Sequence, residues 1–135
     1  MTGIRYELSP SVSSGVLNEL FSRAWDGHTD RDYSAVLERS LVYVCAFSGD
    51  SLVGFANVAW DGGVQGFLLD PTVHPEFRSQ GIGSEMIRRA AAVSEARGLE
   101  WLHVDYEPHL GEFYDTTGFR STEAGLMKLK GCDAG

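Results

Sequence analysis

The segment from Val73 to Met86 constrains the fold more than any other part of the chain. A β-rich run ends at Val73, a short polar loop carries Gly81 and Gly83, and apolar residues at helical spacing follow. The glycines permit positive φ angles and let a ligand approach the backbone closely. Successive N–H groups at the entry to a helix form an anion site. The segment therefore predicts a strand–loop–helix unit that can hold a phosphate or diphosphate, although a glycine turn that binds nothing has the same sequence.

Two common phosphate-binding motifs do not match this loop. A P-loop requires a lysine directly after its last glycine, and no lysine follows Gly83. A dinucleotide fingerprint requires a third glycine at position 86, where Met86 stands. The glycine pair therefore predicts a diphosphate site of another class.

The rest of the chain predicts a mixed α/β fold of the α+β kind, in the order β-α-α-β-β-β-α-β-α-β. Strands are expected over residues 4–8, 41–47, 52–60, 64–73, 101–106 and 119 to about 130. Helices are expected over residues 16–24, near 33–40, from 82 to a stop at Gly98, and from 108 to a stop at Gly118. We expect residues 1–130 to form a single domain, with a mixed sheet of six or seven strands and helices on both faces. Residues 131–135 are expected to form a flexible tail.

Pro71 lies near the end of the fourth expected strand. Proline has no N–H to donate to a neighbouring strand. We therefore expect this strand to be bulged, or unpaired on one side, at that point.

Composition argues against two classes of partner. The chain has 11 basic and 19 acidic residues in 135, a net charge of −8. Nucleic acids and anionic membranes both require clustered Lys and Arg, so neither is expected as a partner. The acidity suits either a cationic partner or simple solubility. No apolar run approaches membrane-spanning length, and the first ten residues contain no apolar signal core.

The two cysteines indicate no disulfide framework. Cys45 lies within an apolar run, where core packing explains it, and Cys132 lies in the expected tail. Because neither cysteine is expected to form a disulfide, the protein suits a reducing compartment, and we expect it to be cytoplasmic.

Two motifs together resemble one known family. The segment from Val73 to Gly83, V-H-P-E-F-R-S-Q-G-I-G, closely resembles the acetyl-CoA signature of the GNAT family of N-acetyltransferases, [RQ]-x-x-G-x-[GA] after a V-x-P strand end. Some thirty residues later, the segment from Glu112 to Phe119 resembles the second signature of that family, a helix that carries Phe-Tyr and ends in Gly-Phe. The resemblance extends from Ile4 to about residue 130, with a matching order of elements.

The resemblance implies an enzyme that binds acetyl-CoA as co-substrate, uses no metal, and transfers the acetyl group directly to a primary amine of a small molecule or peptide. It implies that the fourth and fifth strands separate around the acetyl group. The pantetheine arm would bind along the fourth strand and the diphosphate on the loop amides. The implied cofactor-binding residues are Thr72, Val73, Arg78, Ser79, Gln80, Gly81, Ile82, Gly83 and Ser84.

The resemblance also suggests the catalytic residues. Tyr114 matches the family tyrosine that donates a proton to the departing thiolate, although a tyrosine in this Phe-Tyr pair also suits core packing. Asp70, beside the implied acetyl site, is the preferred general base, and Glu107 and Asp61 are alternatives. The histidines at positions 74, 103 and 109 are expected to be structural.

The acceptor cannot be identified from the sequence. In this architecture acceptor-side residues come from the loop after the first helix, which here contains Trp25, Asp26, His28, Asp30, Asp32 and Tyr33. Aromatic rings with carboxylates suit a cationic amine, while an acidic solvated loop has the same composition. Three alternatives stay open: a catalytically silent acyl-CoA-binding module, a transferase for longer acyl-CoA donors, and a homodimer rather than a monomer.

Overall fold

The computed structural model describes residues 3–131. By its internal contacts the chain divides into an N-terminal unit, Met1–Val104, and a C-terminal unit, Asp105–Gly135. Apart from Gly131, the tail expected over residues 131–135 lies outside the described residues, as does Cys132.

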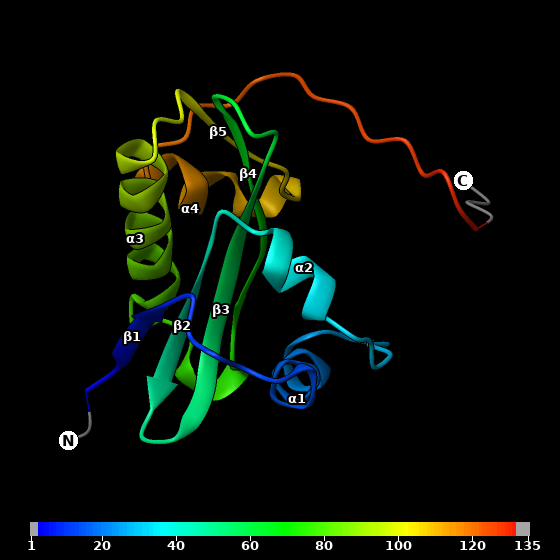
Figure 1. Ribbon diagram of the computed structural model, residues 1–135, viewed down its shortest axis with the longest axis vertical. Coiled ribbons are helices and arrows are strands. Elements are labelled where there is room, and N and C mark those ends of the chain that lie inside the picture. The colour runs from blue at the N-terminus through cyan, green and yellow to red at the C-terminus, as the bar shows by residue number, and fades with distance from the viewer. Residues whose placement is uncertain (1–2, 132–135) are drawn as a thin grey trace. The chain divides into compact units, whose positions relative to one another are not determined.

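The N-terminal unit is a five-stranded mixed sheet with helices (Figure 1). In chain order its elements are β1 (Arg5–Leu8), α1 (Ser14–Ala24), α2 (Ser34–Arg39), β2 (Val42–Ser48), β3 (Ser51–Trp60), β4 (Gln65–Val73), the 3-10 turn η1 (Pro75–Phe77), α3 (Ile82–Ala96) and β5 (Trp101–Val104). The strands lie side by side in sequence order, antiparallel from β1 to β4, and β5 runs parallel to β4. The expected mixed α/β fold is confirmed.

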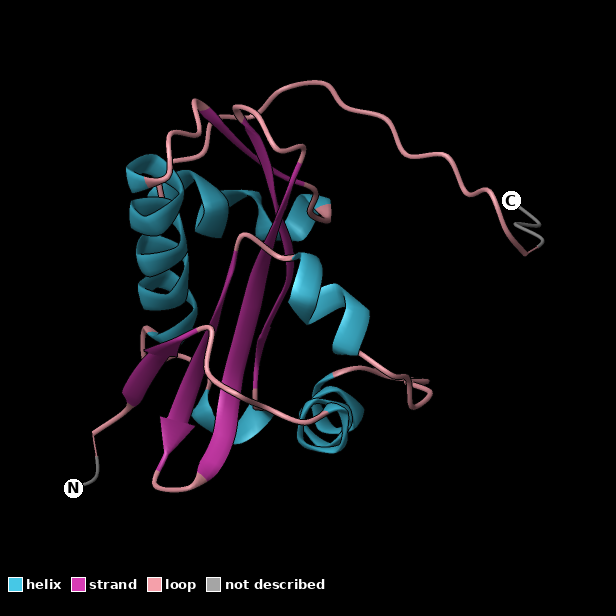
Figure 2. Ribbon diagram, in the orientation of Figure 1, coloured by secondary structure: helices cyan, strands magenta, loops and turns pink. Residues whose placement is uncertain are grey.

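Helices cover both faces of this sheet, as expected (Figure 2). Successive residues of a strand point to opposite faces of the sheet. The contacts of Gly54 and Phe55 in β3 therefore show which helix covers each face. A Cβ at Gly54 would lie 3.0 Å from the Met86 sulfur of α3. The Phe55 ring packs edge-on against Phe21 of α1, with 5.7 Å between ring centroids. The sheet is therefore sandwiched between α3 and α1.

Each covering helix buries one apolar stripe. Helix α1 begins after Ser13, whose hydroxyl accepts the Val16 N–H at 3.2 Å, and it buries Leu17, Leu20 and Phe21. Helix α3 buries four apolar side chains, those of Ile82, Met86, Ile87 and Ala90. The glycine at position 54 lets α3 pack closely on β3, because a side chain there would contact it at 3.0–3.2 Å.

Strand β4 contains the bulge that Pro71 predicts. Phe55 of β3 pairs with Thr72, and Asn57 pairs with Leu69, so Asp70 and Pro71 together oppose a single residue of β3. The backbone of Asp70 is left-handed, with φ +53°. The parallel pairing of β4 with β5 covers only residues Gln65–Leu68 of β4, so the strand continues past the bulge without a partner on β5. This arrangement agrees with the separation that the family resemblance implies.

The C-terminal unit contains the 3-10 turn η2 (Pro108–Leu110) and helix α4 (Gly111–Thr116). No strand follows β5 among the residues described, so the expected strand over residues 119–130 is wrong and the sheet has five strands rather than six or seven. The fifth strand also ends at Val104 and not at residue 106. A strand forms only through pairing with a neighbour, and residues 119–130 pair with none; Leu126 and Leu129 are each 88% exposed.

Candidate functional site

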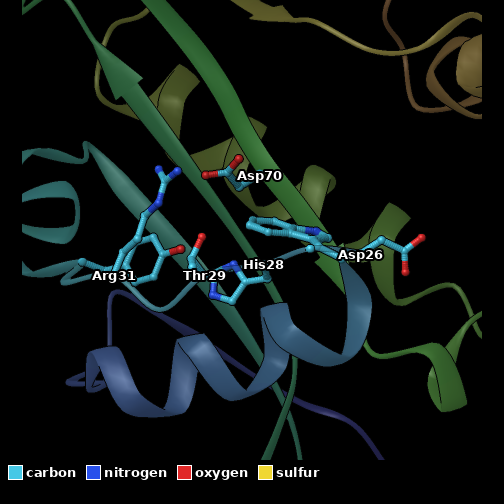
Figure 3. A pocket seen from close by; sticks show the side chains of 8 residues that line it. Asp26, His28, Thr29, Arg31 and Asp70 are labelled. Atoms are coloured by element: carbon cyan, nitrogen blue, oxygen red, sulfur yellow. The ribbon is translucent and has the colours of Figure 1, made fainter. Parts of the chain in front are cut away.

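A cavity of about 270 Å³ lies between the loop that joins α1 to α2 and strand β4 (Figure 3). It is lined by Trp25, Asp26, Gly27, His28, Thr29, Arg31, Tyr33 and Asp70. The structure therefore brings four of the acceptor-side residues expected from the sequence together with the preferred general base. Asp30 and Asp32 do not line the cavity, whereas Thr29 and Arg31 were not expected there.

An aromatic cluster holds one wall of the cavity in place. The Trp25 ring stacks on buried Phe21 of α1 at 4.1 Å, with 3° between the ring planes. Phe21 also packs edge-on against Tyr33 at 5.2 Å and against His28 at 5.8 Å. Ring pairs in these geometries stabilise their arrangement beyond simple burial. The loop side chains are therefore fixed by the helix beneath them.

Asn18, a buried polar residue of α1, fixes the loop backbone. Its amide Nδ2 donates to the Arg31 carbonyl at 2.8 Å, and its Oδ1 accepts the Arg31 N–H at 3.0 Å. Its Oδ1 also lies 2.9 Å from His28 Nε2. Because Oδ1 can only accept, we assign a proton to Nε2 of His28 and leave Nδ1 as the nitrogen that can accept one. One side chain thus sets both the position of Arg31 and the tautomer of His28.

Asp70 combines an unusual backbone with an unusual carboxyl group. Left-handed residues other than glycine are strained, and such strain gathers at functional sites. Although the residue as a whole is exposed, protein atoms partly bury its carboxyl group and raise its pKa above the ordinary aspartate value, while the Arg31 guanidinium opposes that rise. A raised pKa brings a carboxylate closer to the range in which it accepts protons at neutral pH.

The loop from Arg78 to Ser84 has the backbone geometry of an anion cradle. Ser79 and Gly81 are both left-handed, with φ of +64° and +80°, and alternating conformations of this kind direct successive N–H groups to one side. Helix α3 begins at Ile82, so its first N–H groups have no partner within the helix. A Cβ at Gly81 would meet no atom within 4 Å, which leaves the approach to the loop open. The residues present therefore fit a bound diphosphate.

One carboxylate lies in the first turn of α3, but it is neutralised. Glu85 accepts from Arg88 Nε at 3.0 Å and from Arg89 Nε at 2.6 Å. These hydrogen bonds lower the pKa of Glu85 to about 2. The helix entry therefore has no unpaired negative charge that would oppose an anion there.

Tyr114 lies in α4 of the C-terminal unit. Its ring stacks on Tyr106 at 4.6 Å and packs edge-on against Phe113 and Phe119 at 5.0 and 5.9 Å. Burial raises the pKa of its hydroxyl, and Tyr106 raises it further. The phenol is therefore protonated at neutral pH, as a proton donor must be, and its catalytic role stays a prediction.

The other titratable candidates have structural partners. Asp61 accepts from the Gly63 N–H at 2.7 Å and so caps the β3–β4 turn. His103 Nε2 lies 2.6 Å from the Gln65 side chain, and His74 Nδ1 accepts from the Glu76 N–H at 3.1 Å. In the C-terminal unit, exposed Glu107 pairs with His109 at 3.5 Å. These contacts leave Asp70 as the preferred base.

Neither a candidate metal site nor a candidate membrane-spanning helix occurs among residues 3–131. No group of three or more His, Cys, Asp and Glu side chains is placed to hold a metal ion. No helix in this range has both the length and the apolar character needed to cross a membrane.

Comparison with curated proteins finds relatives among acetyltransferases. The chain is 26% identical over 104 residues to an uncharacterized N-acetyltransferase of Prochlorococcus marinus, a match that covers 74% of this chain and 58% of that protein. It is 33% identical over 97 residues to the mycothiol acetyltransferase of Mycobacterium avium, which covers 72% of this chain and 28% of the relative. The chain thus spans less than two thirds of these curated relatives.

Solved structures share the fold over nearly the whole chain. A GNAT-family acetyltransferase from Streptococcus pneumoniae superposes with a TM-score of 0.81 at 24% identity, covering 95% of this chain and 98% of that one. The enzyme AAC(6')-Iy, solved with a CoA bisubstrate analogue, superposes with a TM-score of 0.76 at 20% identity, covering 97% and 100%. The acetyltransferase (GNAT) family model matches residues 14–119. The chain therefore belongs to the GNAT family of acetyltransferases.

Proposed function

We propose that this chain transfers an acetyl group from acetyl-CoA directly to a primary amine of a small molecule or peptide. The observation that carries the proposal is the position of Asp70. It lies on the bulge of β4, lines the cavity, and precedes by three residues the strand end at Val73 that leads into the anion-cradle loop. A base, an acceptor cavity and a diphosphate site thus follow one another along a single strand and its loop.

The cofactor-binding residues are proposed to be those of the signature loop and the end of β4. The backbone of Thr72 and Val73 would extend the sheet to the pantetheine arm, and the amides from Arg78 to Ser84 would hold the diphosphate. When bound, acetyl-CoA supplies the acetyl group as a reactive thioester. The relative AAC(6')-Iy was solved with CoA, which supports this assignment.

The proposed proton path uses two residues. Asp70 removes a proton from the acceptor ammonium, and the free amine nitrogen forms a bond to the acetyl carbon; the resulting tetrahedral intermediate then breaks its carbon–sulfur bond. Tyr114 gives its proton to the sulfur, the second proton on the nitrogen leaves and restores the Tyr114 hydroxyl through solvent, and Asp70 releases its proton to solvent, so that the products are an N-acetyl amine and CoA. The proposed transfer forms no acyl-enzyme, and Cys45 is poorly suited to form one, because burial raises the pKa of its thiol to about 12 and leaves almost no thiolate near neutral pH.

A thiol-release assay over a panel of amines tests the proposal. The purified protein should release CoA from acetyl-CoA only when an acceptor amine is present, and Asp70→Asn should lower the rate about 10²–10⁴-fold. Asp61→Asn is the matched control, because Asp61 only caps a turn, and it should leave the rate within a few-fold.

Three results would contradict the proposal. Binding of acetyl-CoA with no release across the panel would indicate a silent acyl-CoA-binding module. Faster release from longer acyl-CoA donors would show a different donor. Equal rates in the Asp70→Asn variant and the parent would remove Asp70 as the base.

A further inference from the structure

We propose that the amine acceptor also carries a carboxylate, and that the guanidinium of Arg31 binds it in the cavity. The acceptor class is then the amino acid, or the peptide with a free terminal carboxylate close to its amine. This inference rests on the proposed acetyl transfer and adds the chemistry of the acceptor.

Arg31 is the only Lys or Arg among the residues that line the cavity. Within residues 3–131 its guanidinium donates no hydrogen bond and forms no ion pair, whereas its backbone N–H and carbonyl are both held by Asn18. The backbone of Arg31 is held in place while the N–H donors of its planar guanidinium are free within the described residues. Such a side chain is suited to bind a carboxylate through two parallel hydrogen bonds.

The opposite charge comes from a different element. Asp70 extends from β4 and Arg31 from the α1–α2 loop, and Figure 3 shows both side chains at the same cavity. No ion pair joins them, although Arg31 is near enough to affect the Asp70 carboxyl group. An ammonium beside Asp70 and a carboxylate beside Arg31 would satisfy these two charges, and Asp26, the other carboxylate of the lining, lies apart from both in Figure 3. A simple cationic amine would satisfy Asp70 but leave Arg31 to repel it.

Size points in the same direction. Pockets for drug-sized ligands measure about 300–1,000 Å³. The cavity, at about 270 Å³, falls just below that range. Its wall of Trp25, Tyr33 and His28 is fixed by ring contacts with Phe21. A small zwitterion can be held entirely within such a site.

A carboxylate on Arg31 would also help the chemistry. The positive charge of Arg31 holds down the pKa of Asp70, which burial otherwise raises. Neutralising Arg31 with the acceptor's own carboxylate would remove that effect. Asp70 would then become a stronger base only when the correct acceptor is bound.

The test compares amino acids with their amides in the acetyl-CoA thiol-release assay. Each amide has a less basic amine than its parent acid, so amine ionisation alone favours the amide. The parent protein should nevertheless show a kcat/KM at least about tenfold higher for the acid of its preferred pair. Dipeptides and decarboxylated amines in the same panel distinguish free amino acids from peptides and confirm that the carboxylate is required.

Variants at Arg31 separate this inference from the proposed function. Arg31→Leu should lower kcat/KM for the acid about 10–100-fold, mainly through KM, and should not lower it for the amide. Arg31→Lys should retain part of the preference, because it keeps the charge without the fork. The control is Arg23→Leu, an exposed arginine of α1 outside the cavity, which should behave as the parent.

Two results would overturn the inference while the proposed function stands. One is acetylation of acids and amides at equal rates, and the other is a preference for the acid that persists in the Arg31→Leu variant. If no amine is acetylated, the proposed function fails, and calorimetry with the amino acids alone decides the inference. Carboxylate-dependent binding that Arg31→Leu removes would support it. No binding by any amino acid would overturn it.

Discussion

Replacing Gly81 with valine tests the anion cradle directly. Gly81 has φ +80°, and a Cβ there would contact no protein atom within 4 Å. A left-handed backbone costs an L-residue about 1–2 kcal/mol. In a domain of this size that corresponds to a fall in Tm of about 4–8 °C. The added side chain would also occupy the approach to the loop and turn its amides away. The loss of two hydrogen bonds to a charged phosphate, at about 1.5–3 kcal/mol each, would weaken acetyl-CoA binding about 100-fold or more.

Gly62 provides a matched control in the turn between β3 and β4. It has φ +83° and the same open space around a would-be Cβ. Gly62→Val should therefore lose a similar amount of thermal stability but bind acetyl-CoA as the parent does. Calorimetric titration with acetyl-CoA and thermal melts of the three proteins measure both quantities. Equal affinity in Gly81→Val and Gly62→Val would refute the assignment of the diphosphate to this loop.

Three further predictions concern single side chains. The rate of acetyl transfer should rise with pH through a pKa above the ordinary aspartate value, because burial raises the pKa of Asp70 and only its ionised form accepts a proton. Asp70→Asn should remove this rising limb of the pH–rate profile. A limb that persists in the variant would show that another group causes it. Tyr114→Phe should lower turnover about 10²–10⁴-fold with little change in acetyl-CoA affinity, and turnover within a few-fold of the parent would make Tyr114 a packing residue. In a Cys132→Ser protein, buried Cys45 should resist alkylation by iodoacetamide at pH 8 until denaturant is added, because its pKa of about 12 leaves almost no thiolate. Rapid alkylation of the folded protein would contradict the burial of Cys45.

Local chemistry explains what the sequence predicted well. The glycine pair at 81 and 83 marks a loop whose backbone needs a left-handed residue, and Gly81 has that conformation. Pro71 predicts the bulge because proline cannot donate to a neighbouring strand, and the register of β4 shifts there. The left-handed residue of the bulge is Asp70 rather than the proline, because the proline ring fixes its own φ at a negative value and aspartate enters the left-handed region more readily than most residues.

The failures come from contacts between distant residues. The expected strand over residues 119–130 is absent because a strand needs a neighbour to pair with, and the sequence does not identify one. Asn18 lies beside the apolar stripe of α1. Its three contacts are with loop residues 10–13 positions away, so the sequence around Asn18 does not predict them. Arg31 is hidden by the acidic composition of its loop, although it is the only Lys or Arg between Trp25 and Tyr33, a signal that could have found it.

The left-handed Asp70 has a consequence for how the reaction could be lost in evolution. The left-handed backbone and the raised pKa of its carboxyl group both oppose the folded state, and the proposed role as general base is what would favour aspartate over a neutral residue there. Asparagine tolerates the left-handed region and carries no charge to bury, and glycine has no strain there at all. A lineage that kept the fold for another purpose would be free to drift to either residue. The residue at this bulge is therefore a marker by which silent members could be recognised among homologues.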